Sequence, residues 1–188
     1  MFTQKIILAS QSPRRKQLLE WAEIDFDVIV SATDESFPPG ISFDETAIHI
    51  ARNKALAVVE TSGDQLPVLA ADTIVVCDET VIGKPVDRAD AIRILKQLSG
   101  KQHKVITGVV ILYKGRELCF ADTTLVDFHP LTDEQVTYYV DHYKPYDKAG
   151  AYAIQEWIGV TGIKSIQGDF YNVMGLPVSR VIQQLNML

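Results

Sequence analysis

The segment at residues 66–76 (LPVLAADTIVV) constrains the fold more than any other part of the sequence, because it is almost entirely apolar and rich in β-branched residues. Such a run predicts a buried β-strand. Only Asp72 and Thr73 interrupt it. A buried carboxylate costs free energy unless it is paired, protonated or bound to a metal. Asp72 is therefore either a structural buried carboxylate or part of a functional site, since sites in α/β proteins gather at strand ends.

Helix and strand patterns alternate along the rest of the chain. We expect helices over residues 13–21, 43–59, 87–98, 132–143 and from 175 to the C-terminus. We expect further strands over 5–9, 26–30, 81–82, 104–113, 118–128 and 158–166. Ser42 with Glu45, and Thr132 with Gln135, form capping-box patterns at two helix starts. With no repeat, linker or low-complexity tract, the sequence predicts a single α/β domain over residues 1–188.

The charge balance limits the size of an anionic partner. The 188 residues include 18 Lys and Arg against 24 Asp and Glu, which gives a formal net charge of -6 at pH 7. Binding to long nucleic acid depends on many cations that displace counterions, so we expect no long nucleic acid as a partner. A small polyanion in a local basic pocket is still compatible with this charge.

The chain carries no pattern of a membrane or secreted protein. Its apolar runs fall short of the about 18 residues that span a bilayer, and the first is too short for a signal segment. The two cysteines, Cys77 and Cys119, are far apart and lack the spacing of metal ligands. We therefore expect a soluble, cytoplasmic protein with free thiols and no membrane partner.

A candidate phosphate-binding loop lies between the first strand and the first helix. Ser10 and Ser12 supply hydroxyls, Ser12 fits the N-cap position, and Arg14 and Arg15 follow in the first helical turn. Helix N-termini favour anions, and a guanidinium bonds two phosphate oxygens at once. The alternative is an ordinary capped helix with solvated arginines.

Four further residues are candidates for a site, and each has a plain alternative. Lys54 lies next to the apolar stripe of its helix and Lys84 follows a strand, so both are either ligand-binding cations or surface lysines. Glu35, in an acidic loop, is either an oxygen ligand that joins Asp72 on Mg²⁺ or a solvated carboxylate. Gln155 follows a run of small residues, where its amide either reads a base edge or lies in a turn.

Seven segments of the chain, most of which contain these candidate residues, occur in an order that resembles the Maf family of nucleoside triphosphate pyrophosphatases. They are residues 10–15, 34–35, 52–55, 71–73, 83–85, 148–155 and 172–177. The resemblance spans nearly the whole chain, and it departs from the family pattern at Glu156-Trp157, where a glycine is usual.

The resemblance implies a fold and a reaction. The fold is a mixed, curved sheet flanked by helices, with two lobes around a central cleft, similar to the inosine triphosphate pyrophosphatases. The reaction is hydrolysis of a nucleoside triphosphate, dTTP or UTP in this branch, to the monophosphate and pyrophosphate, with Mg²⁺ or Mn²⁺ as cofactor. It also implies a homodimer and a possible role in clearing modified nucleotides.

The resemblance also implies a role for each candidate residue. Asp72 is the proton acceptor and, with Glu35, a metal ligand. Lys54 and Lys84 are catalytic cations. The phosphates are bound by Ser10, Ser12 and Arg15, and the base is selected by Arg14, Thr73 and Gln155.

Two other functions stay open from the sequence. One is a regulatory binding protein that affects septum formation, with little catalysis. The other, which rests on fold analogy alone, is a pyrophosphatase that prefers purine nucleotides such as ITP or XTP.

Overall fold

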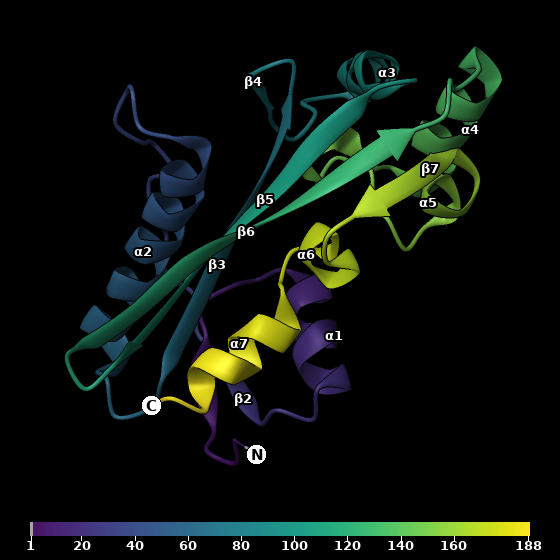
Figure 1. Cartoon of the computed structure of the whole chain (residues 1–188). Helices are drawn as coiled ribbons and strands as arrows, with labels where there is room; N and C mark the ends of the chain where they lie inside the picture. Colours follow the sequence, from purple (N-terminus) through teal and green to yellow (C-terminus); the bar gives the residue numbers. More distant parts are fainter. Residues whose placement is uncertain (1) are drawn as a thin grey trace. The chain divides into compact units, whose positions relative to one another are not determined.

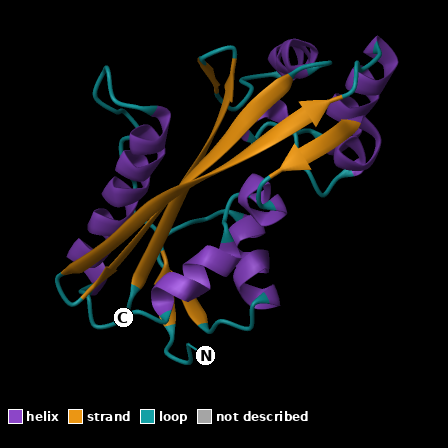
Figure 2. Ribbon diagram, viewed as in Figure 1, coloured by secondary structure: helices purple, strands orange, loops and turns teal. Residues whose placement is uncertain are grey.

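A computed structural model describes residues 2–188 and shows helices that flank a seven-stranded sheet (Figures 1 and 2). The strands are β1 (Ile6–Leu8), β2 (Phe26–Val28), β3 (Val68–Cys77), β4 (Thr80–Ile82), β5 (Gln102–Tyr113), β6 (Arg116–Phe128) and β7 (Ile163–Gln167). The α-helices are α1 (Pro13–Trp21), α2 (Phe43–Ser62), α3 (Arg88–Leu98), α4 (Asp133–Tyr143), α5 (Trp157–Gly162), α6 (Phe170–Met174) and α7 (Val178–Leu185), and a 3₁₀ turn covers Ala149–Ala151.

The sheet is mixed, which confirms the predicted fold class. Its strand order is β2-β1-β3-β5-β6-β7, and β4 pairs with β3 beside this path. Strand β1 is parallel to β2 and β3, whereas β4 is antiparallel to β3 and β7 is antiparallel to β6. Lys114 and Gly115 alone join β5 to β6, and both have positive φ, as the predicted hairpin requires.

The residues group into two compact units. Unit 1 comprises the chain up to Thr73 together with Thr107–Asp122 and Gly175–Leu188, and unit 2 comprises Ile74–Ile106 and Thr123–Met174. Strands β3, β5 and β6 contribute residues to both units. The single domain over 1–188 and the cleft between two lobes stay predictions.

In unit 1, α2 packs against the sheet through small residues. The cluster consists of Ala51, Ala55 and Val58 of α2 with Ile7, Ala9, Val68, Ala70 and Val110 of the sheet and its edge. The alternate sheet residues Ile6, Leu8 and Leu69 are fully buried as well. Because side chains alternate between the two faces of a strand, both faces of this part of the sheet are covered. That explains why β1 and β3 are apolar at nearly every position.

The core of unit 2 is formed by α3 and α4 and by an aromatic cluster. The buried residues of the two helices are Ala91, Ile94, Leu95 and Leu98 of α3 and Val136, Tyr139 and Val140 of α4. His103 lies edge-on to Phe128 and Tyr152, and its Nε2 is 2.8 Å from the Tyr152 hydroxyl. Burial lowers the pKa of His103 to about 4, so this ring is neutral at pH 7 and belongs to the core.

The predicted capping boxes are present at α2 and α4. Helix α2 continues to Ser62, three residues beyond the predicted end, and α6 had no counterpart in the predictions. No helix within residues 2–188 has the length and apolar character needed to cross a membrane.

The strand predicted over 158–166 is wrong in its first half, where α5 precedes β7. Ile158 and Gly162, four residues apart, are buried, whereas Val160 between them is 82% exposed. This is the spacing of a helix. Gly159 permits the close turn, because a Cβ there would lie 1.7 Å from the carbonyl oxygen of Ile154.

Candidate functional site

Asp72 and Glu35 converge on one lysine in unit 1. The Lys54 ammonium lies 2.6 Å from Asp72 Oδ1 and 2.7 Å from Glu35 Oε1. The side chains of Asp72 and Lys54 are only 14% and 19% exposed, whereas that of Glu35 is 54% exposed. The carboxylate that interrupts the apolar strand is therefore paired, as its burial requires.

Three different elements position these three groups. Asp72 lies in the middle of β3, Lys54 lies on α2 between the buried Ala51 and Ala55, and Glu35 lies in the loop between β2 and α2. The alanines of α2 pack directly against the sheet, which brings the helix close to β3. The Lys54 side chain is long enough to reach Asp72 on β3 from there. The Lys54 ammonium is directed at Asp72 and not at solvent, and its role as a ligand-binding cation stays a prediction.

Arg15 braces the predicted phosphate loop. It is 8% exposed, and its guanidinium donates three hydrogen bonds: from Nε to the Gly175 carbonyl at 2.7 Å, to Ser10 Oγ at 3.0 Å and to Thr73 Oγ1 at 3.0 Å. A guanidinium has five N–H donors, so two of them donate no hydrogen bond within residues 2–188. Solvated arginine is thus the wrong description of Arg15.

Burial lowers the pKa of the Arg15 guanidinium, while the charges of Asp72 and Glu35 act in the opposite direction. Arg14, half-buried on the same helical turn, adds a further lowering effect through charge repulsion. Arg15 therefore lies close enough to Arg14, Asp72 and Glu35 for their charges to act on its guanidinium.

Ser12 occupies the N-cap position of α1, but its side chain makes no capping hydrogen bond. Its backbone N–H instead donates to Ser10 Oγ at 3.2 Å. Ser12 therefore lies at the predicted N-cap position, but the alternative of an ordinary capped helix is wrong. The loop is instead held by Ser10 Oγ, which also accepts a hydrogen bond from Arg15. The Ser12 hydroxyl is not used by the helix.

Sequence reasoning missed one partner in this network. Thr73 Oγ1 lies 2.9 Å from Thr107 Oγ1, on β5. Gly175, whose carbonyl accepts a hydrogen bond from Arg15, lies in the family segment 172–177. A Cβ at Gly175 would lie 3.6 Å from both Arg15 Nε and Thr73 Oγ1. Thr107 carried no signal in the sequence, since threonine is common in strands.

The donor set fits a hard divalent cation that is shared with phosphates. No group of three or more His, Cys, Asp and Glu side chains able to hold a metal occurs among residues 2–188. Two carboxylates, Glu35 and Asp72, do lie within reach of one ammonium. Mg²⁺ is typically held by one or two carboxylates plus substrate phosphates rather than by a cage of protein ligands, so this pair is suitable.

The other two predicted site residues belong to unit 2. Lys84 is exposed and follows β4, and Gln155 is exposed in the turn before α5. The segments that carry them are joined, because the Gly150 N–H donates to the Gly83 carbonyl at 3.2 Å. Gly150 has a φ of 73°, and Val75 lies 3.1 Å from the place of a Cβ there, so this contact depends on glycine.

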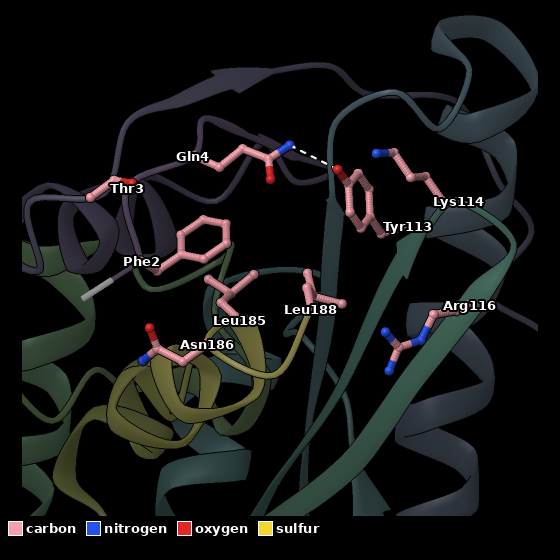
Figure 3. Close-up of a pocket in the computed structure, with 9 residues that line it drawn as sticks. All are labelled: Phe2, Thr3, Gln4, Tyr113, Lys114, Arg116, Leu185, Asn186 and Leu188. Carbon is pink, nitrogen blue, oxygen red and sulfur yellow. Dashed lines mark hydrogen bonds between the residues drawn. The ribbon is translucent and has the colours of Figure 1, made fainter.

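Unit 1 also contains a pocket of about 510 Å³ (Figure 3). It is lined by Phe2, Thr3, Gln4, Tyr113, Lys114, Arg116, Leu185, Asn186 and Leu188. The Gln4 amide donates to the Tyr113 hydroxyl at 3.3 Å. None of the ten predicted site residues lines this pocket.

The sequence is similar to a known protein family and to individual proteins of that family. The model of the family described as Maf-like protein matches residues 5–188. A protein of Parabacteroides distasonis named dTTP/UTP pyrophosphatase is 50% identical over 182 residues, which cover 96% of this chain and 94% of that protein. A protein of the same name from Cytophaga hutchinsonii is 49% identical over 97% of this chain and 84% of its own length.

Similar solved structures include the Ham1 protein of Staphylococcus aureus (TM-score 0.47, 14% identity, 66% of this chain and 72% of that one). Another is a nucleoside-triphosphatase, dITP/XTP pyrophosphatase, of Mycobacterium abscessus (TM-score 0.40, 18% identity, covering 66% of this chain and 72% of that one). The sequence relatives, not these weaker structural likenesses, carry the assignment. With the family model matched over residues 5–188, and with relatives near 50% identity along almost its whole length, the chain belongs to the Maf family.

Proposed function

We propose that this protein hydrolyses nucleoside triphosphates, with dTTP and UTP as preferred substrates, to the monophosphate and pyrophosphate. The observation that carries the proposal is the Lys54 ammonium held between Asp72 and Glu35, within the charge influence of the buried Arg15. Relatives at 46–50% identity bear the name dTTP/UTP pyrophosphatase, which supports this substrate class.

Asp72 is the proposed proton acceptor. The ammonium of Lys54 bonds its Oδ1, and no hydrogen bond to Oδ2 is found from residues 2–188. That second oxygen is available to take a proton from the water that attacks the α-phosphorus, as a general base does. The bond between the α-phosphorus and the bridging oxygen then breaks, and pyrophosphate leaves.

Cations neutralise the charge that develops on the leaving pyrophosphate. We propose that Lys54 and Arg15 bind phosphate oxygens, Arg15 through its two remaining N–H groups, and that the hydroxyls of Ser10 and Ser12 donate beside them. Lys84 is proposed as a further catalytic cation on the strength of the family resemblance. The same resemblance supports Arg14, Thr73 and Gln155 as the residues that select the base.

Glu35 and Asp72 would hold the divalent metal, Mg²⁺ or Mn²⁺. The metal would supply Lewis-acid polarisation and charge neutralisation at the phosphates. In the structure, the Lys54 ammonium occupies the space between these two carboxylates. For the two carboxylates to hold the metal, Lys54 would have to release them, and its charge would then be available to the phosphates.

Replacing Lys54 is expected to tighten metal binding while it slows turnover. Lys54→Met removes the positive charge that lies between the Asp72 and Glu35 carboxylates, so the Kd for Mn²⁺ in the absence of nucleotide should fall by about 10-fold, and kcat should fall as well. Titration followed by electron paramagnetic resonance of free Mn²⁺ measures the Kd. Lys114→Met, on the exposed β5–β6 turn, makes the same change of charge and should leave both values unaltered. Unchanged or weaker Mn²⁺ binding by Lys54→Met would contradict the proposal that Lys54 and the metal compete for the two carboxylates.

A panel of nucleoside triphosphates tests the function itself. With Mg²⁺ or Mn²⁺ present, dTTP and UTP should release pyrophosphate faster than ITP, XTP or the other common triphosphates. Faster turnover of ITP or XTP would favour the purine alternative, and no turnover of any triphosphate would favour the regulatory binding protein.

The resemblance also supports a cytoplasmic homodimer as a proposal. Sedimentation of the purified chain should give twice its mass of 20.9 kDa.

A further inference from the structure

Gln155 lies at an exposed point of an otherwise buried stretch in unit 2. Ala151, Tyr152, Ala153 and Ile154 are each at most 6% exposed, and the chain then turns at Gln155 before α5 begins. The turn is closed by a hydrogen bond from the Glu156 N–H to the Ala153 carbonyl at 3.1 Å. The backbone position of Gln155, from which its side chain projects, therefore depends on what holds residues 153–156.

One hydroxyl holds both ends of this turn. Tyr139 projects from α4 and is fully buried. Its hydroxyl oxygen accepts the Ala153 N–H at 3.1 Å, and its O–H donates to the Glu156 carboxylate. Because the tyrosine ring is fixed by burial, the two ends of the turn are fixed to a rigid point of α4.

A buried lysine reinforces the Glu156 end. Lys148 is 8% exposed, and its ammonium lies 2.7 Å from Asp147 Oδ1 and 3.6 Å from Glu156 Oε1. A buried ammonium requires a partner of opposite charge. Asp147 is the first such partner of Lys148, and Glu156, with 22% of its side chain exposed, is the second. Glu156 thus links Lys148, Tyr139 and the start of α5.

We infer that Glu156, held by Tyr139 and Lys148, is a positioning residue that sets the direction of the Gln155 amide and so the selectivity for the pyrimidine base. This inference rests on the proposed function, in which Gln155 reads the base. A side-chain amide discriminates between bases only when its donor and acceptor are held in one orientation, since a freely turning amide bonds several base edges equally well. Glu156 acts through Gln155 and needs no contact with the substrate.

The test compares Glu156→Ala and Tyr139→Phe with wild type, and Glu134→Gln, an exposed acid on α4, is the control. Steady-state kinetics with UTP and GTP give kcat and KM for each base, and inhibition by inorganic tripolyphosphate reports the phosphate subsite alone. We expect the preference for UTP over GTP in kcat/KM to shrink by about 10-fold in both variants, mainly through KM for UTP. Tripolyphosphate inhibition should stay unchanged, and Glu156→Gln, which retains an acceptor for Tyr139, should lie between wild type and Glu156→Ala.

A second measurement does not depend on catalysis. Hydrogen–deuterium exchange of the peptide that spans residues 153–157 should be faster in Glu156→Ala than in wild type or Glu134→Gln, because one anchor of the turn is lost. Unaltered exchange together with an unaltered UTP preference in Glu156→Ala would overturn the inference, even if Tyr139→Phe failed to fold. A wild-type protein that hydrolyses no triphosphate would instead overturn the proposed function, and exchange in Glu156→Ala would still decide whether Glu156 holds the turn.

Discussion

Asp72→Asn is expected to lower kcat for UTP hydrolysis by roughly 10³-fold, because an amide neither accepts a proton from water nor carries the charge that holds a divalent metal. The fold should survive the change. Asparagine has nearly the same shape, it retains an acceptor for the Lys54 ammonium, and Lys54 keeps its contact with Glu35. Pyrophosphate release under saturating UTP and Mg²⁺ measures the effect.

Asp27→Asn provides the matched control for this variant. Asp27 lies on β2 in the same unit and also pairs with a lysine, Lys5, at 2.7 Å, but at the surface. It should retain wild-type kcat. Full activity of Asp72→Asn, with circular dichroism and thermal unfolding like those of wild type, would show that Asp72 is a structural carboxylate after all.

Gly108→Ala is expected to destabilise the protein by at least about 3 kcal/mol or to prevent folding. Gly108 lies on β5 where α2 crosses it, and a Cβ there would lie 2.3 Å from the backbone of Ala47 and Ile48. Backbone atoms in the middle of a packed helix cannot give way, so α2 would have to move off the sheet. That movement would also carry Lys54 away from Asp72.

Urea unfolding followed by circular dichroism measures the loss for Gly108→Ala. Gly83→Ala is the control, since within residues 2–188 no atom beyond the adjacent residues lies within 4 Å of a Cβ at Gly83, and its φ is not positive. Its free energy of unfolding should stay within about 0.5 kcal/mol of wild type. A similar value for Gly108→Ala would mean that α2 does not approach β5 as closely as the structure has it.

The sequence was most informative where one local rule decided the structure. The two capping boxes located the starts of α2 and α4, and the Lys114-Gly115 pair located the β5–β6 turn. It was least informative at 158–162, where isoleucine and valine suggested a strand and only the burial of Ile158 and Gly162 revealed a helix. Short apolar runs are compatible with either structure until tertiary contacts choose between them.

In the candidate site, too, some residues are indicated by a local sequence signal and others are brought together only by packing. A carboxylate within an apolar strand is a signal that the sequence contains, and Asp72 was found by it. Its partners Lys54 and Glu35 come from a helix and a loop, so their convergence on Asp72 depends on packing. The Thr73–Thr107 contact and the Tyr139–Glu156 anchor join residues 34 and 17 positions apart, and no sequence pattern pairs them.

The central claim is that water attacks the α-phosphorus with help from Asp72. Turnover of UTP in water labelled with heavy oxygen tests it most directly, because mass spectrometry of the products shows which phosphorus received the water. We expect one labelled oxygen in the monophosphate and none in the pyrophosphate, and we expect Asp72→Asn to form these products roughly 10³-fold more slowly. Label in the pyrophosphate, or release of orthophosphate in its place, would contradict it.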